Sequence, residues 1–194
     1  KPLLATLGEQ YFRDPGDDHL PLRLGRADAA RLAELAQGPE LSWQGGDELH
    51  GFAQRLQSLA VREVSPPAGL QAELRSYQLQ GLNWMQTLAE LRVGGVLADD
   101  MGLGKTLQTL AHILCEKQAG RLDKPALIVM PTSLIPNWQD EAARFTPQLR
   151  VLALHGSKRK ALFEEITEHD LILTTYALLP RDLKALNQHR YRLL

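Results

Sequence analysis

Hydrophobic positions after residue 70 follow two alternating patterns. Apolar residues recur at helical spacing in several segments, which predicts helices over 71–91, from Leu107 to Cys115, and over 133–145, 161–167 and 178–188. Short apolar runs between them predict strands at 96–98, 126–130, 151–154 and 171–174, and a further strand opening at 192–194. This alternation predicts an α/β fold in which helices flank both sides of a parallel sheet.

The first third of the chain is organised differently. Leucines alternate with other residues over 20–24, as in a strand buried on one face. Asp28 and Asp47 each precede a short stretch with helical spacing. We therefore expect residues 1–64 to form a small α/β or mostly helical N-terminal region with a packing or docking role.

A proline- and glycine-rich segment separates the two patterns. Residues 65–70 have the sequence SPPAGL, and prolines of this kind do not continue a helix. We interpret them as a linker between the N-terminal region and a lobe formed by 71–194. The chain begins without Met and stops inside an apolar run, so we expect both ends to be cuts in a longer protein.

Composition excludes several classes of protein. With 44% hydrophobic and 23% charged residues, the chain can bury a core. The aliphatic run at 126–130 is far too short for a membrane span, Cys115 is the single cysteine, and the six histidines show no zinc-ligand spacing. The net charge of −1 excludes nucleic-acid binding by overall charge alone, so such binding has to be local.

A glycine-bearing loop lies between the predicted strand at 96–98 and the next helix. Its sequence, DDMGLGKT from Asp99 to Thr106, supplies glycines that let backbone N–H groups point into one hollow. Lys105 offers a compact cation for β- and γ-phosphates, and the Thr106 hydroxyl is suited to ligating Mg²⁺. The strict pattern has glycine where this chain has Asp99. We interpret the Asp99–Asp100 pair as shaping the loop entrance rather than as an acid–base pair.

Five ordered blocks resemble the Swi/Snf-type DNA-dependent ATPases of helicase superfamily two, in a bacterial-looking form. The loop resembles motif I of that family. Residues 74–78 (LRSYQ), with Gly81 and Trp84, resemble its adenine-recognition block. The remaining blocks that carry the resemblance are 127–138 (LIVMPTSLIPNW), His155–Gly156 and 171–176 (LILTTY).

The resemblance implies a RecA-like first motor lobe of a double-stranded-DNA-stimulated ATPase. Such a motor uses ATP and Mg²⁺, translocates along DNA and remodels protein–DNA complexes, so a DNA-bound protein or RNA polymerase is an expected target. The family's Asp-Glu motif and its second RecA-like lobe are expected beyond Leu194. We therefore expect this chain alone to bind nucleotide weakly without hydrolysing it. The resemblance also leads us to expect that the parent protein is cytoplasmic and nucleoid-associated.

Candidate site residues follow from these blocks. The resemblance assigns Gln78 to the adenine edge; a capping or surface glutamine is the alternative. Lys105 and Thr106 are the catalytic candidates, and Thr106 is the metal candidate through ATP. The full set expected to contact the nucleotide is Arg75, Gln78, Asp100, Met101, Gly102, Leu103, Gly104, Lys105, Thr106 and Leu107.

Strand-end loops provide the candidates for DNA contact. Hydroxyl and backbone N–H groups at such places can hold phosphates. Alternatives remain open: Thr132 or Ser133 as a helix cap, His155–Gly156 as a turn, and the basic run 157–160 as a solvated face. The candidates are Pro131, Thr132, Ser133, His155, Gly156, Lys158, Thr174, Thr175 and Tyr176.

Two other functions remain compatible with the residues alone. One is a small, complete P-loop phosphotransferase, although no base or acceptor pocket is evident. The other is a non-catalytic interaction module with a vestigial phosphate loop.

Overall fold

The computed structural model describes residues 51, 61 and 63–194. The chain divides into two compact units, Lys1–Ala60 and Val61–Leu194, and the description below concerns the second. The elements predicted after Asp28 and Asp47, and the strand at 20–24, lie outside the described residues.

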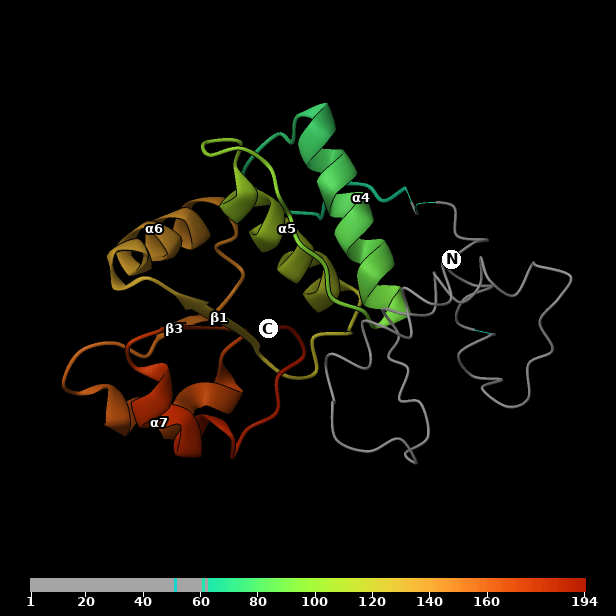
Figure 1. The fold of residues 1–194 in the computed structure, drawn as a ribbon. Coiled ribbons are helices and arrows are strands. Elements are labelled where there is room, and N and C mark those ends of the chain that lie inside the picture. Colours follow the sequence, from blue (N-terminus) through green and yellow to red (C-terminus); the bar gives the residue numbers. More distant parts are fainter. Residues whose placement is uncertain (1–50, 52–60, 62) are drawn as a thin grey trace, which may run out of the picture. The chain divides into compact units, whose positions relative to one another are not determined.

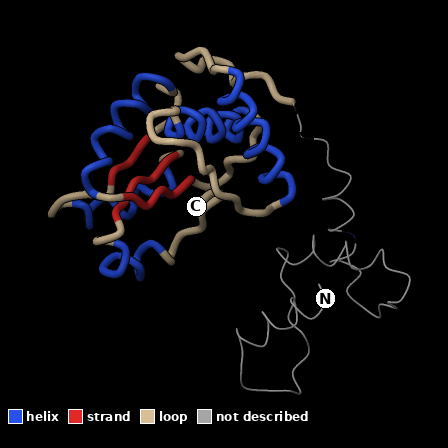
Figure 2. The backbone as a smooth tube through the Cα atoms, turned by 45° about the horizontal axis from the view of Figure 1, so that its top comes forward, coloured by secondary structure: helices blue, strands red, loops and turns tan. Residues whose placement is uncertain are grey.

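Three parallel strands form the sheet, in the order β1-β3-β2. They are β1 (Ala126–Met130), β2 (Val151–Ala153) and β3 (Leu171–Thr175), seen side by side in Figure 2. Ala126 and Val151 both pair with Leu171, so the two outer strands start level with the central one. The prediction of a parallel sheet is confirmed. β3 is buried along its whole length, as expected for an apolar run without alternation.

Of the two remaining predicted strands, the structure supports the one at 192–194 and not the one at 96–98. At the free edge of β1, Leu193 forms a parallel bridge with Ala126, and its carbonyl accepts a 2.9 Å hydrogen bond from the Leu127 N–H. The segment 192–194 therefore does begin to extend the sheet. The strand predicted at 96–98 is wrong: these residues form a loop, and Val96 is 83% exposed. No described strand lies alongside them, and a strand needs a hydrogen-bonded neighbour.

Helices cover both faces of the sheet, as predicted (Figure 1). Because side chains alternate along a strand, Leu171 and Leu173 pack in one apolar cluster and Ile172 in the other. The first cluster includes residues of α5 and α6, with α4 lying against α5; the second includes residues of η3 and α7. The helices are α4 (Ser76–Leu91), α5 (Lys105–Gln118), the 3₁₀ turn η2 (Thr132–Leu134), α6 (Ile135–Phe145), the 3₁₀ helix η3 (Arg159–Glu168) and α7 (Leu179–Leu186).

The start of α4 differs from the prediction. The helix begins at Ser76 rather than at residue 71 and ends at Leu91 as predicted, where Arg92 follows in the left-handed conformation, with φ of 56°. The Val93 N–H reaches back to the Leu88 carbonyl at 3.1 Å, which closes the last turn. Gly95 lies against α4: a side chain there would overlap the ring of the half-buried Trp84.

The predicted linker is fastened to the lobe. Ala68 exchanges two hydrogen bonds with the Gln118 side chain, with N–H to Oε1 at 3.1 Å and Nε2 to O at 2.5 Å. Gln148 donates to the Gly69 carbonyl at 2.7 Å, and Leu70 packs against the first apolar cluster. Residues 68–70 therefore run along the ends of α5 and α6 rather than away from them.

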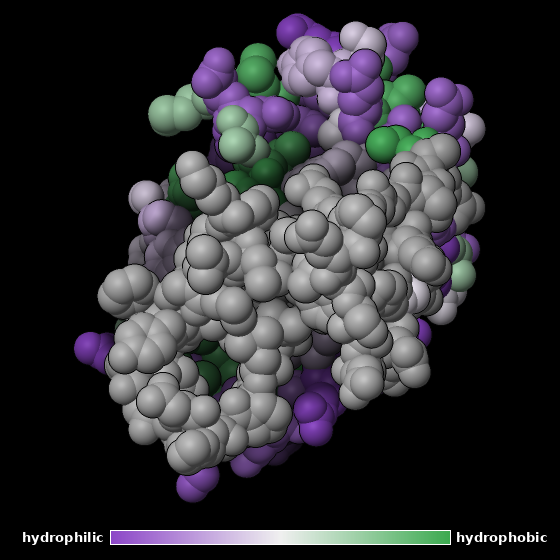
Figure 3. All heavy atoms as spheres, turned by 45° about the vertical axis from the view of Figure 1, so that its right-hand side comes forward, coloured by the Kyte–Doolittle hydropathy of each residue, from purple (hydrophilic) through white to green (hydrophobic). Residues whose placement is uncertain are grey.

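Exposed apolar side chains are dispersed over the described part of the lobe. They include Val96, Met101, Leu134, Tyr176 and Leu183. On the face drawn in Figure 3, hydrophobic and hydrophilic side chains of the described residues are interspersed. No helix among the described residues is long and apolar enough to cross a membrane.

A buried polar network, which no local sequence pattern indicates, joins α4, α5 and the C-terminal segment. Glu116 of α5 is fully buried and accepts hydrogen bonds from Arg121 at 2.6 Å and from Arg192 at 3.3 Å. Arg121 also donates to the Gln86 amide oxygen at 2.8 Å. The Gln86 Nε2 lies 2.8 Å from His112 Nδ1 and therefore donates to it.

The network sets the charge of its members. Burial by itself raises the pKa of Glu116, but the hydrogen bond and charge of Arg121 outweigh it and hold that pKa below its ordinary value. Burial lowers the pKa of His112, and Arg121 and Arg192 lower it further against the opposing effect of Glu116. His112 is therefore a neutral acceptor in the folded lobe. Burial also raises the pKa of the neighbouring Cys115 thiol to about 11, so it stays protonated at neutral pH.

The lowered pKa of His112 predicts a pH-dependent stability. Below about pH 6.5 the unfolded chain binds a proton at this residue before the folded chain does, so the free energy of unfolding falls as the pH falls. The slope for one such group approaches roughly 1.4 kcal/mol per pH unit. His112→Asn keeps a side-chain acceptor for Gln86 but cannot titrate. Denaturant unfolding at pH 7.5 and 5.5 should show a smaller loss for this variant than for the wild type. Equal losses would contradict the assignment.

Candidate nucleotide site at the phosphate loop

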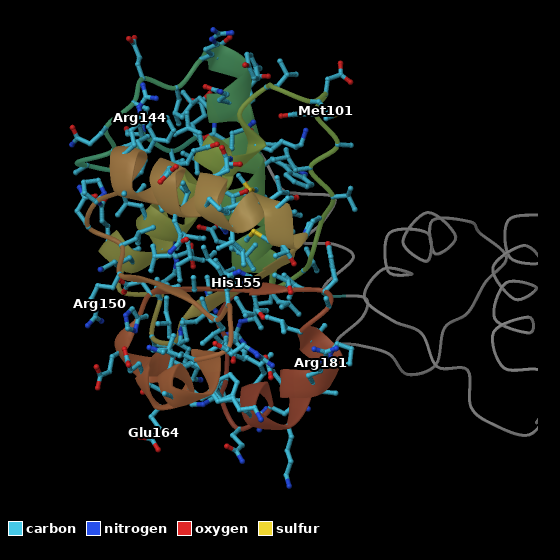
Figure 4. The ribbon with its side chains drawn as sticks, turned by 90° about the vertical axis from the view of Figure 1, so that its left-hand side faces the viewer. Met101, Arg144, Arg150, His155, Glu164 and Arg181 are labelled. Carbon is cyan, nitrogen blue, oxygen red and sulfur yellow. The ribbon has the colours of Figure 1, made fainter. Side chains whose placement is uncertain are left out.

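The glycine-bearing loop joins the segment 96–98 to the N-terminus of α5. Gly102 and Gly104 both adopt the left-handed conformation, with φ of 85° and 77°. Gly104 is the N-cap of α5, and the first turn of the helix carries no acidic residue. The positive end of the helix dipole therefore faces the loop. Met101, labelled in Figure 4, lies at the margin of the molecule and is 96% exposed.

Lys105 turns back into the loop. Its ammonium donates hydrogen bonds to the backbone carbonyls of Asp99 at 2.6 Å and Asp100 at 2.8 Å. The cation is thereby held beside the loop rather than extended into solvent. The half-buried Thr106 is in the first turn of α5, and its hydroxyl makes no hydrogen bond within the part of the chain that the structure describes.

Gln78 connects α4 to the same loop. Its amide oxygen accepts a 3.0 Å hydrogen bond from the Arg75 N–H, and its Nε2 donates to the Leu103 carbonyl at 3.1 Å. The capping role, weighed above as the alternative, is thus present, and the loop contact accompanies it. A primary amide still retains one donor and one acceptor after these two bonds. Arg75 itself is exposed at the start of the helix.

The loop entrance is held from α5. Gln108, which is fully buried, donates from Nε2 to the Asp99 carboxylate at 2.9 Å. This bond ties Asp99 to α5, whereas its role in shaping the loop entrance stays a prediction. Gln108 did not stand out in the sequence; the one available signal was a glutamine among apolar neighbours on the inner side of a predicted helix.

The DNA candidates gather where the parallel strands end, because parallel strands present their carboxyl ends at one edge. Thr132 and Ser133 after β1 are exposed, as is Tyr176 after β3, whose N–H donates to the Met130 carbonyl at 3.2 Å. Neither η2 nor α6 has a side-chain cap, so the capping alternative for Thr132 and Ser133 is not observed. The exposed set at this edge is Pro131, Thr132, Ser133, His155, Gly156, Lys158 and Tyr176.

Thr174 and Thr175 need a correction. Both side chains have 0% exposure, and their hydroxyls lie without a partner among the described residues. The two residues belong to the central strand β3, which is paired with β1 and β2 at its edges and lies in a sheet whose two faces are covered by helices. Their hydroxyls therefore do not reach a surface that DNA could contact in this structure.

One residue of the basic run 157–160 after β2 is engaged in an ion pair, and the two lysines are not buried. Arg159 forms a two-pronged contact with the buried Asp182 of α7, with Nε–Oδ2 at 2.6 Å and Nη2–Oδ1 at 3.0 Å. This hydrogen bond raises the pKa of Arg159, and the guanidinium also donates to the Gly156 carbonyl at 3.1 Å. Gly156 has φ of 77°, as a tight turn requires. Arg159 thus fixes the turn at His155, visible in Figure 4, while Lys158 and Lys160 stay exposed.

A glycine-bearing loop that carries Lys and Thr into a helix, beside a parallel sheet flanked by helices, defines the P-loop class of α/β domains. The chain belongs to the family of SNF2-related domains, whose family model matches residues 77–194.

Relatives with known names agree with this membership. The chain is 42% identical over 135 residues to the putative ATP-dependent helicase/translocase YwqA of Bacillus subtilis, covering 68% of this chain and 14% of that protein. It is 36% identical over 174 residues to helicase SWR1 of Eremothecium gossypii, covering 86% of this chain and 11% of that protein. The chain therefore spans a small part of the length of the relatives it matches.

A solved structure supports the fold. The SWI2/SNF2 ATPase core of Sulfolobus solfataricus in complex with double-stranded DNA is 38% identical, with a TM-score of 0.61. The likeness covers 68% of this chain and 27% of that one. The parallel sheet and its flanking helices are thus those of an SNF2-type, RecA-like lobe.

The contact between Gln78 and the loop predicts an asymmetry between two glycines. Gly104 and Gly120 both have positive φ, but a side chain at Gly104 would meet Gln78 Nε2 at 2.6 Å, whereas nothing lies within 4 Å at Gly120. Gly104→Ala should lower the free energy of unfolding by about 1 kcal/mol more than Gly120→Ala. Denaturant unfolding of the two variants measures the difference, and equal losses would mean that Gln78 does not hold the loop.

Proposed function

We propose that the phosphate loop binds ATP with Mg²⁺. The observation that carries this proposal is the Lys105 cation, which follows the left-handed Gly102 and Gly104 at the N-terminus of α5 and is held by two loop carbonyls. Backbone N–H groups and the helix dipole at such a place favour a polyphosphate anion. A polyphosphate also offers Lys105 charged oxygens, which are stronger acceptors than the neutral carbonyls it contacts here.

The other loop residues fit the remaining parts of the nucleotide. The Thr106 hydroxyl, without a partner among the described residues, would ligate Mg²⁺, which would neutralise charge on the phosphates. Gln78 retains one amide donor and one acceptor, the pair that the edge of adenine requires. Arg75, Asp100, Met101, Leu103 and Leu107 would line the site through their positions in or next to the loop.

For the whole protein we infer an ATPase stimulated by double-stranded DNA that translocates along DNA and remodels protein–DNA complexes. The names of the relatives and the DNA-bound archaeal core support this inference. DNA would contact the exposed carboxyl edge of the sheet, including His155, Lys158 and Tyr176. A DNA-bound protein or RNA polymerase would be the target, and the protein would be cytoplasmic and nucleoid-associated.

The 194 residues by themselves would bind nucleotide weakly and not hydrolyse it. The Asp-Glu motif that the family places at the end of a strand has no counterpart in the described residues, where the pair Asp140–Glu141 lies within α6. Hydrolysis would also need a second RecA-like lobe, which closes over the nucleotide and stabilises charge on the transferring phosphoryl group.

ATP hydrolysis by the full-length protein, with and without duplex DNA, tests the proposed function. We expect duplex DNA to raise the rate and Lys105→Ala to lower it roughly a hundredfold or more, because the phosphate charge loses its cation. Lys124→Ala is the matched control, since this exposed lysine precedes β1 at the opposite edge of the sheet. A Lys105→Ala variant as active as the control would refute nucleotide binding at this loop, and a rate indifferent to duplex DNA would refute the motor function.

A further inference from the structure

Asp99 places a negative charge beside the proposed phosphate site. Its backbone carbonyl is 2.6 Å from the Lys105 ammonium, so its own carboxylate is within one short side chain of that cation. A carboxylate that turned towards the ammonium would pair with it and would also repel an incoming polyphosphate. The strict phosphate-loop pattern has glycine, which carries no side chain, at this position.

Gln108 holds the carboxylate by a side-chain hydrogen bond. Its Nε2 donates to Asp99 Oδ2 at 2.9 Å from within α5. A hydrogen bond to an ionised acceptor is stronger than one between neutral groups. The bond therefore engages the charge of Asp99 at Gln108, three residues after Lys105 in α5, while the Lys105 ammonium contacts backbone carbonyls.

Packing alone does not account for a glutamine at this position. The Gln108 side chain is fully buried, and its amide oxygen has no hydrogen-bond partner among the described residues. An unpartnered buried amide oxygen is costly, and an apolar side chain of similar size would avoid that cost. The amide oxygen also occupies the space that a side chain at Gly81 of α4 would take, so the two helices leave room for it.

We propose that Gln108 is a positioning residue that keeps the Asp99 carboxylate away from Lys105, so that the loop can accept a nucleoside triphosphate. This inference rests on the proposed function, because it concerns the same loop. It explains how this chain tolerates an aspartate where the strict pattern has glycine.

Steady-state ATPase kinetics of the full-length protein with duplex DNA test the proposal through a double-mutant cycle. Gln108→Leu should raise KM for ATP about tenfold with little change in kcat, because the freed charge opposes ground state and transition state alike. In the Asp99→Asn background, which has no charge to release, the same substitution should raise KM less than about threefold. Gln80→Leu, on the exposed side of α4, is the matched control.

The outcomes separate this inference from the proposed function. An equal rise in KM in both backgrounds, or no rise, would overturn the role of Gln108. Lys105→Ala in the same assay tests the proposed function separately. If the loop does not bind the nucleotide, this variant stays fully active. If thermal unfolding shows that Gln108→Leu is not folded, Gln108→Met replaces it, because the methionine side chain is unbranched and similar in length to glutamine.

Discussion

Two glutamine amides hold the phosphate loop, one at each end, and the arrangement of the site depends on them. Gln78 of α4 binds the Leu103 carbonyl at 3.1 Å, and Gln108 of α5 binds the Asp99 carboxylate at 2.9 Å. The Lys105 ammonium donates hydrogen bonds to two backbone carbonyls of the same loop. Both amides reach the loop only if α4 and α5 keep their mutual position. The buried network around Glu116 stabilises that position, because it joins Gln86 of α4 to α5 through charge-assisted hydrogen bonds.

The sheet imposes the second constraint. Its parallel strands bring the segments after β1, β2 and β3 to a single edge, although they are far apart in the sequence. The ion pair between Arg159 and Asp182 fixes one of these segments against α7. The phosphate loop is positioned by helices and the proposed DNA edge by strands, so the two parts of the site rest on different elements of one lobe.

Local patterns made much of this predictable, and non-local contacts account for the remainder. The parallel sheet and the helix after the loop follow from apolar periodicity and glycine spacing, which act over a few residues. The false strand at 96–98 has the right residues but no neighbour to pair with. The burial of Thr174 and Thr175 depends on which elements cover β3, and the role of Gln108 depends on where Asp99 lies. Glu116, an ordinary helix-surface residue by type, is buried because two arginines from other segments reach it.

Nuclear magnetic resonance of the isotopically labelled chain during addition of Mg-ATP detects weak nucleotide binding and locates it on the chain. We expect the largest shifts at the backbone amides of residues 102–106 and at the side-chain amide of Gln78. In Lys105→Ala these shifts should disappear at the same nucleotide concentration. Shifts confined to other parts of the lobe, or unchanged shifts in Lys105→Ala, would contradict the claim that this loop is the nucleotide site.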